Sequence, residues 1–241
     1  MLNTVRLTDL IYIDIETAPV CKTFEDLTAL EKILWNEKKG RLKPENESEE
    51  EYYFQHAGIF AEFGKLICIS VGWFMEDKDF SGLKIKSFYG HDEIQLLKDF
   101  ALFLQHAVAS NKNKQLCGHN IKEFDIPFIC RRMLMNNFPL PDYFEQLQAK
   151  KPWEAGLLDT MDLWKFGDYK NYISLKLLAY SLGIPSPKDD ISGSDVGKVY
   201  WNEQDIERIK TYCQKDVLTV AQIILKLKGK KLISENEVLF V

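Results

Sequence analysis

The sequence predicts an α/β domain in three layers, with a mixed central sheet and helices on both of its faces. Short apolar runs, rich in β-branched and aromatic residues, alternate along the chain with longer segments whose apolar residues recur every three or four positions. Two of the short runs follow each other closely, which suits an antiparallel hairpin within the sheet. A length of 241 residues suits one domain, 1–241, with room for an insertion.

The first expected strand is 10–16, which ends at Thr17-Ala18-Pro19. A helical spacing of apolar residues follows it, formed by Phe24, Leu27, Leu30, Ile33 and Leu34. Residues 36–51 are polar and charge-rich and contain a glycine and a proline, so we expect a solvated loop insertion there.

Two strands and a helix are expected next. The strands are about 65–75 and 83–89, and residues 78–82 join them as a hairpin. Asp92-x-x-Gln95 resembles a capping box and opens a helix through Gln105. The positions of that helix expected to face inward are Ile94, Leu97, Phe100, Ala101 and Leu104.

The second half of the chain continues the alternation. A strand at 115–119 leads into a helix at 126–135, with Pro127 just inside its first turn. The remaining expected elements are a strand at 157–160, a helix at 175–182 capped by Ser174, a loop at 186–198, a final helix within 202–228 and a C-terminal tail at 229–241.

Composition limits the class of function. The formal net charge is −5, which argues against tight duplex binding driven by phosphate neutralisation. The five cysteines are scattered and form no C-x-x-C pair, so we expect reduced core thiols in the cytoplasm. We expect no signal peptide and no membrane contact, because residues 1–10 lack an apolar core segment and no apolar run is long enough to span a bilayer.

Two carboxylates lie two residues apart in the first strand. Side chains alternate across a strand, so Asp14 and Glu16 point to the same face. Burying two like charges together is costly unless a cation lies between them, which indicates a metal ion. The alternative is a structural ion pair involving one of the two.

Two further carboxylates can complete such a site. Asp125 lies at a predicted helix start, where an acid can also serve as an N-cap. Asp216 fills the core-facing position between Cys213 and Val220 in the final helix, and Tyr212 lies one turn before it. An ion pair of Asp216 with Lys176 or Lys215, and a packing role for Tyr212, are the structural alternatives.

These residues form three ordered motifs: Asp14-x-Glu16, Asn120-x-x-x-Phe124-Asp125 and Tyr212-x-x-x-Asp216. They resemble the three motifs of the DEDD superfamily of 3′–5′ exonucleases, in the tyrosine subgroup. The segment 62–71 is similar to the second strand of the exonuclease domain of family-B DNA polymerases. The chain most resembles the small stand-alone bacterial proteins described as predicted exonucleases related to that domain, and this resemblance implies an RNase H-like fold.

Four carboxylates without a histidine or cysteine ligand favour a hard cation, Mg²⁺ or Mn²⁺. The resemblance implies two such ions, bridged by Asp14, with Glu16 and Asp216 completing the first site and Asp125 holding the second. It also implies that Tyr212 orients the attacking water. Thr17, Asn120 and Phe124 are candidates for contact with the terminal nucleotide, and core packing is the alternative for Phe124.

The function that this resemblance implies is hydrolysis of single-stranded DNA from its 3′ end, releasing nucleoside 5′-monophosphates. An exoribonuclease, and an inactive nucleic-acid-binding module of the same fold, are the alternatives. A polymerase or repair protein acting in trans remains open as a partner. Outside the motifs we expect His119 to be a polar strand end, Asp159 and Asp162 to be helix-start acids, and the lysines at 226, 228, 230 and 231 to form a solvated face.

Overall fold

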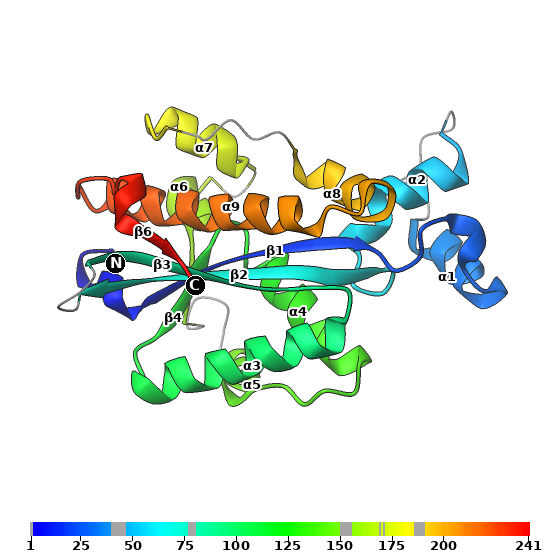
Figure 1. The fold of residues 1–241 in the computed structure, drawn as a ribbon, viewed down its shortest axis with the longest axis horizontal. Helices are drawn as coiled ribbons and strands as arrows, with labels where there is room; N and C mark the ends of the chain where they lie inside the picture. Colours follow the sequence, from blue (N-terminus) through cyan, green and yellow to red (C-terminus); the bar gives the residue numbers. More distant parts are fainter. Residues whose placement is uncertain are drawn as a thin grey trace.

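A six-stranded mixed sheet forms the centre of the protein (Figure 1). The computed structural model describes residues 2–39, 47–76, 81–149, 156–168, 170, 172–185 and 191–241. The strands are β1 Leu10–Pro19, β2 Gly64–Glu76, β3 Ser81–Tyr89, β4 Gln115–Gly118, β5 Leu157–Asp159 and β6 Val238–Phe240. Their order is β5-β4-β1-β2-β3-β6, and β2 is antiparallel to both β1 and β3, whereas β4, β5 and β6 join in parallel. The mixed sheet confirms the prediction from the sequence, and its strand order is the RNase H-like arrangement that the resemblance implied.

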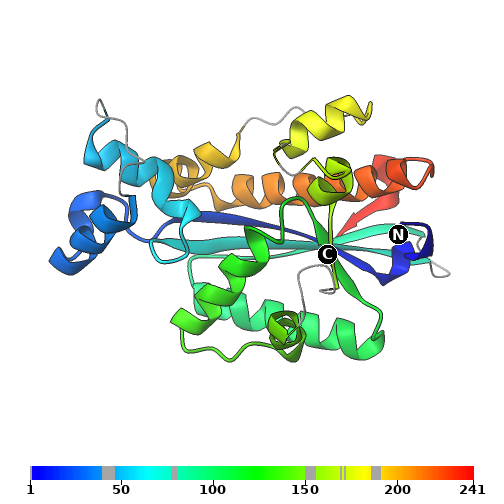
Figure 2. The same ribbon diagram turned by 180° about the vertical axis from the view of Figure 1, so that it is seen from behind.

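Helices cover both faces of the sheet, as Figures 1 and 2 show from opposite sides. The helices are α1 Ala29–Lys39, α2 Glu49–His56, α3 Glu93–Ser110, α4 Asp125–Met135, α5 Asp142–Ala149, α6 Thr160–Lys165, α7 Leu175–Ser181, α8 Val196–Lys198 and α9 Ile206–Leu227. One face carries α3, α4 and α5, and the other carries α9 with α6, α7 and α8 beside it. Helices α1 and α2 lie beyond the end of β1 (Figure 1).

Alternation along β1 assigns its side chains to the two faces. Ile11, Ile13 and Ile15 belong to the core under α3 and α4. Leu10 and Tyr12 belong to the core under α9. By the same period of two, Asp14 and Glu16 point to the α9 face. The strand pattern therefore carries two carboxylates into the layer between the sheet and α9.

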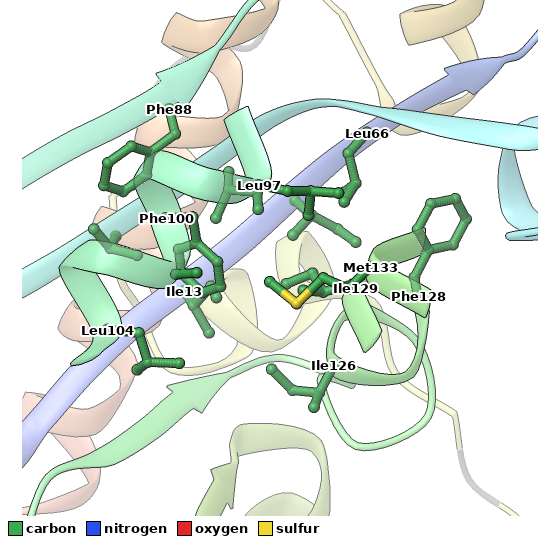
Figure 3. Packing of buried hydrophobic residues seen from close by; sticks show 14 of the residues in the cluster. Ile13, Leu66, Phe88, Leu97, Phe100, Leu104, Ile126, Phe128, Ile129 and Met133 are labelled. Carbon is green, nitrogen blue, oxygen red and sulfur yellow. The ribbon is translucent and has the colours of Figure 1, made fainter. Parts of the chain in front are cut away.

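The core on the opposite face is closely packed (Figure 3). Ile13 lies between Phe100 of α3 and the α4 residues Ile126 and Ile129 in this view. Phe88 packs against Phe100 with the two rings 6.0 Å apart at 69°. Each of these side chains contributes roughly 1.5–3 kcal/mol by burial, so the core holds α4 and its first residue at a fixed place against β1.

Helix α9 approaches the sheet closely at Gly72 of β2. A Cβ atom added at Gly72 would lie 2.8 Å from Cγ1 of Val217, so glycine is required for this packing. A polar contact fixes the helix as well: Gln214 Nε2 donates to Ser87 Oγ over 3.0 Å, and Ser87 Oγ lies 2.8 Å from Ser70 Oγ. Both contacts lie beside Tyr212 and Asp216 in sequence and hold the middle of α9 on β2 and β3.

Two expected apolar faces differ from the structure. Phe24 and Leu27 are buried before α1 begins, but Leu30, Ile33 and Leu34 of α1 are exposed, and Trp35 is the fully buried residue of that helix. The spacing of apolar residues shows which face of a helix is apolar but not which other segments pack against the helix. Trp35 is buried because aromatic residues of α2 and of the segment after it pack against its ring. In α3, which runs on to Ser110, Ile94 is exposed and Leu96 is buried, whereas the other expected inward positions are buried.

Several expected loops contain regular structure. Of the expected insertion 36–51, residues 36–39 belong to α1 and 49–51 to α2, and 40–46 lie outside the described residues. Of the expected loop 186–198, residues 193–198 form a short 3-10 helix and α8, and 186–190 lie outside the described part. The C-terminal tail supplies β6, which pairs with β3. The hairpin of β2 and β3 is confirmed, although residues 77–80 of its connection are not described.

No helix in the described part of the chain is both long enough and apolar enough to cross a membrane.

A buried ion pair joins α3 to α4 near the start of β2. Arg132 donates to both carboxylate oxygens of Glu93, over 2.8 and 2.5 Å. Glu93 also accepts from the main-chain N–H of Leu66, and Arg132 donates to the carbonyl of Ala61 over 2.9 Å. Both side chains are about nine-tenths buried, so the charges depend on each other for their solvation.

We expect Arg132→Met to lower the free energy of unfolding by about 3–5 kcal/mol, because it leaves the Glu93 carboxylate buried without its counter-charge. Urea denaturation measures this change. Lys198→Met removes an exposed pair with Glu203 and serves as the control, with an expected cost below about 1 kcal/mol. Equal costs for the two variants would contradict a structural role for the buried pair.

Candidate active site

One cavity of about 430 Å³ collects the residues of all three sequence motifs. The predicted site residues that line it are Asp14, Glu16, Thr17, Asn120, Phe124, Asp125, Tyr212 and Asp216. They come from the second half of β1, the loop between β4 and α4, the first residue of α4 and the first half of α9. Segments up to about 200 positions apart in the sequence therefore meet at one place on the α9 side of β1.

Asp14 and Glu16 are held in a poorly solvated environment. Glu16 is 6% exposed, and Oδ2 of Asp14 is a buried oxygen without a hydrogen-bond partner in the described part of the chain. Burial, and then the charge of Asp216, raises the pKa of Asp14 well above its usual range. Burial, and then the charge of Asp14, raises the pKa of Glu16 in the same way. A structural ion pair does not account for this geometry, because no basic side chain of the described residues contacts either carboxylate.

Asp125 is the first residue of α4, and Phe124 occupies the N-cap position. The interpretation of Asp125 as an N-cap is therefore wrong. Its carboxylate accepts instead from its own N–H and from the main-chain N–H of Ile15 on β1. Burial outweighs these two hydrogen bonds and raises the pKa of Asp125 to about 8. The tertiary contact with β1 explains the difference, since it draws the side chain away from the helix and into the cavity.

Tyr212 and Asp216 face the cavity from adjacent turns of α9. The hydroxyl of Tyr212 donates to the carboxylate of Asp216. Burial, and then the charge of Asp216, raises the pKa of Tyr212 far above its usual value, so the phenol is neutral at any physiological pH. Lys176, one expected partner of Asp216, lies exposed on α7.

The three candidate substrate contacts lie at the rim of the cavity. Thr17 donates its hydroxyl to the carbonyl of Gly58 over 2.7 Å. Asn120 has φ of 63°, a left-handed conformation that asparagine tolerates, and its carbonyl accepts from Phe124 N–H over 3.0 Å. Phe124 packs partly against the core, with its ring 5.6 Å from that of Phe128, and it also lines the cavity.

Asp159 shapes the second motif, a role that sequence analysis missed. It is the N-cap of α6, as expected, and accepts from Met161 N–H over 2.9 Å. The same carboxylate also accepts from the main-chain N–H groups of Asn120 and Lys122, over 2.9 and 3.2 Å. A neighbouring acid, Asp162, pairs with Lys122 over 2.9 Å. Asp159 therefore ties the turn that precedes Asp125 to the end of β5.

Other cavity residues also lay outside the sequence prediction. They are Ile59, His119, Tyr172 and Gly193. His119 is more than a polar strand end: Nε2 donates to the carbonyl of Ile173 over 2.8 Å, and Nδ1 lies 2.9 Å from the hydroxyl of Thr160. Adjacency to the second motif was a signal for His119, but nothing in the sequence indicates that the other three would meet the motifs.

The donor set fits a divalent cation. One carboxylate oxygen each from Asp14 and Glu16, together with Sγ of Cys213, lie within 4.8 Å of one another, and Asp125 and Asp216 line the same cavity. The buried oxygen of Asp14 without a hydrogen-bond partner is the kind of atom that a cation satisfies. Oxygen ligands of this number suit Mg²⁺ or Mn²⁺. All five cysteines are free, as expected, but the sequence did not place the thiol of Cys213 beside the carboxylates.

Comparison with known proteins identifies the family of the chain. Residues 59–232 match the model of a family described as a predicted 3′–5′ exonuclease related to the exonuclease domain of PolB. The chain belongs to this family. Asp125, Tyr212 and Asp216 lie within the matched residues, whereas Asp14 and Glu16 precede them. The enzyme class predicted from the motifs, a 3′–5′ exonuclease, is thus also that of the family.

A solved structure is similar over most of the chain. The family B DNA polymerase from the hyperthermophilic archaeon Pyrobaculum calidifontis has 17% sequence identity and a TM-score of 0.49, over 91% of this chain and 24% of the polymerase chain. This exonuclease-family chain therefore spans about a quarter of the length of that polymerase. A comparison with curated proteins gives no match.

The raised pKa of Asp125 predicts how the stability of the metal-free protein depends on pH. A carboxyl that is easier to protonate in the folded state than in the unfolded state stabilises the fold through its bound proton. This contribution to the free energy of unfolding is fully present below the unfolded pKa of 3.8 and is lost as the pH rises to about 8. We therefore expect the free energy of unfolding in chelator to fall between pH 4 and 8, and Asp125→Asn to reduce that fall. Urea denaturation across this range measures it.

Glu123→Gln is the matched control, because it removes one exposed negative charge from the same loop. It should leave the pH dependence unchanged. If Asp125→Asn keeps the full wild-type slope, the Asp125 carboxyl is not held in the low-dielectric environment described above.

Proposed function

We propose that the whole chain works as one 3′–5′ exonuclease domain that removes nucleoside 5′-monophosphates from single-stranded DNA 3′ ends with two divalent metal ions. One observation carries the proposal: four carboxylates and a neutral tyrosine hydroxyl from three distant segments line a single cavity. The net charge of −5 agrees with a protein that grips a strand end through bound cations rather than through a basic surface.

The residues at the cavity divide into metal ligands and substrate contacts. Asp14, Glu16, Asp125 and Asp216 would hold the ions, which supply Lewis-acid activation of water and neutralise charge on the leaving oxygen. Burial, and then like-charge crowding, raises the pKa values of Asp14 and Glu16, and a bound cation would offset both effects. The carboxylates therefore bind cations more strongly as the pH rises and the protons leave.

Tyr212 has a positioning role in this proposal. Its hydroxyl is neutral, and its hydrogen bond to Asp216 fixes the direction of the phenol beside the carboxylates. A neutral phenol is a poor metal ligand but can hydrogen-bond to a water molecule and orient it. At the rim, Phe124 presents an aromatic ring that can stack on a terminal base, while Asn120 and Thr17 lie within reach of sugar and phosphate.

The proposal is tested by a time course on end-labelled single-stranded DNA and RNA of one sequence, with Mg²⁺, Mn²⁺, Ca²⁺ or chelator. We expect nucleoside 5′-monophosphates from DNA with Mg²⁺ or Mn²⁺, little turnover with Ca²⁺, whose looser coordination positions the reacting groups poorly, and none in chelator. Asp14→Asn controls for a contaminating nuclease and should be inactive.

Each other outcome has a defined meaning. Undiminished cleavage in excess chelator contradicts the metal-site assignment. Faster cleavage of RNA, through contacts to the 2′-hydroxyl, identifies an exoribonuclease. Strand binding without cleavage under every metal condition identifies an inactive module of the same fold.

Tyr212→Phe separates positioning from metal binding, since it keeps the ring and removes only the hydroxyl. We expect turnover to fall by a factor of about ten to a thousand, with metal affinity nearly unchanged. Asp14→Ala should abolish turnover and weaken metal binding as well. Calorimetric metal titration, together with turnover, compares the three proteins. Equal loss of metal binding in both variants would make Tyr212 structural, and wild-type turnover in Tyr212→Phe would place it outside the reaction.

A further inference from the structure

Two cysteine thiols lie directly behind the paired carboxylates. Cys68 on β2 is the cross-strand partner of Glu16, so both side chains share the α9 face of the sheet. Cys213 is on α9, in the turn that separates Tyr212 from Asp216, and packs in the same cluster as Cys68. Both cysteines are fully buried, and their thiols contact each other.

Cys213 is in contact with the first carboxylate. Its Sγ donates to the main-chain carbonyl of Asp14 over 3.4 Å. The same sulfur lies within 4.8 Å of one carboxylate oxygen of Asp14 and one of Glu16, and those two oxygens are within the same distance of each other. We call Asp14, Glu16 and Cys213 the thiol–carboxylate cluster.

The carboxylates of this cluster have few hydrogen-bond donors, and the donor to the side chain of Asp14 is the thiol of Cys213. The side chain of Glu16 is more than nine-tenths buried and accepts no hydrogen bond from any described residue, and Oδ2 of Asp14 is buried and equally without a partner. Buried polar oxygens without donors are rare in proteins and call for a ligand. Here the free lone pairs face a sulfur atom as well as the cavity.

Sulfur changes which cations such a site prefers. Mg²⁺ takes oxygen ligands only, whereas Zn²⁺ and similar ions bind thiolate strongly, with a Zn–S distance of about 2.3 Å and a Zn–O distance of about 2.0–2.2 Å. Those bond lengths place sulfur and oxygen about 3.5 Å apart around a tetrahedral ion. The three ligand atoms need to approach one another by up to about 1.3 Å to reach this arrangement.

We propose that Asp14, Glu16 and Cys213 form a binding site for a thiophilic divalent cation of the Zn²⁺ and Cd²⁺ class, which inhibits the enzyme. On binding, the S–H bond of Cys213 breaks, its proton leaves to solvent, and a sulfur–metal bond forms with no change of oxidation state. Cys68, in contact with Cys213, is placed to supply a fourth ligand. Coordination of the thiophilic cation draws the carboxylates of Asp14 and Glu16 toward α9 and away from the ions used in hydrolysis. Binding stands by itself, but its inhibitory effect rests on the proposed function.

The binding test uses Cd²⁺ and the metal-free full-length protein, kept reduced by a phosphine that does not bind the ion. Cadmium bound to thiolate absorbs in the ultraviolet, and oxygen-bound cadmium does not. We expect a saturable band at one equivalent in the wild type. Cys213→Ala and Cys213→Ser should lose the band and at least about tenfold in Cd²⁺ affinity. Cys117→Ala is the matched control, because Cys117 is a fully buried cysteine in the core under another part of α9, and it should keep both.

Circular dichroism establishes that each variant is folded, and the serine variant preserves the side-chain volume if alanine disturbs the packing. A full-strength band in folded Cys213→Ser overturns the proposal. So does a wild-type protein that binds Cd²⁺ without any thiolate band, since the ion would then be held by oxygen alone.

The inhibition test titrates Zn²⁺ against turnover supported by saturating Mg²⁺, with each variant compared to its own uninhibited rate. We expect half-inhibition of the wild type and of Cys117→Ala at Zn²⁺ concentrations at least about tenfold lower than for Cys213→Ser. Equal potency in all three overturns the role of the thiol. A Cys213-dependent Cd²⁺ band in a protein without nuclease activity supports the cation site while contradicting the proposed function. Mg²⁺-supported turnover without such a band supports the proposed function and contradicts the cation site.

Discussion

The crowding of four carboxylates around one cavity is the constraint on which the other features of this protein depend. Burial and neighbouring like charges make the ionised carboxylates costly in the folded state. The raised pKa values of Asp14, Glu16 and Asp125 are the result of this cost. The surrounding structure has to hold them there against their mutual repulsion. Two large apolar cores on opposite faces of the same sheet supply the necessary stabilisation.

Specific polar contacts then fix the positions of the segments that form the cavity, which apolar burial alone does not determine. Asp159 holds the turn before Asp125 through two main-chain N–H groups, and Ile15 donates to the Asp125 carboxylate itself. On the other wall, Gly72 lets α9 approach β2, and the contact of Gln214 with Ser87 fixes the helix. Apart from the contact of Ile15 with Asp125, these contacts do not involve the charges of the residues that line the cavity, and they anchor each wall of the cavity to the sheet. Such support keeps functional side chains in place in the absence of bound ions.

The cavity also combines two kinds of ligand atom. Carboxylate oxygens, which suit hard cations, line the cavity, and the sulfur of Cys213 lies within 4.8 Å of an oxygen of Asp14 and one of Glu16. The same strand alternation that turns Asp14 and Glu16 toward α9 turns Cys68 toward α9 as well, because Cys68 is the cross-strand partner of Glu16. Selectivity between cations in the two proposed sites would therefore depend on the packing of α9 on the sheet as well as on the acidic motifs.

The sequence by itself determined the α/β class, the strands and long helices, and the shared face of Asp14 and Glu16, because these follow from the local periods of 2 and 3.6. Ordered motif spacing also indicated that Asp125, Tyr212 and Asp216 belong with them. Only the tertiary structure decided which apolar face is buried in α1, since the partners of Trp35 come from other segments. It decided the three-residue β6, which forms by pairing with β3 about 150 positions earlier. It also decided that Asp125 turns toward β1, that Asp159 holds the turn before it and that Cys213 joins the carboxylates, because each of these depends on contacts between segments that no local pattern encodes.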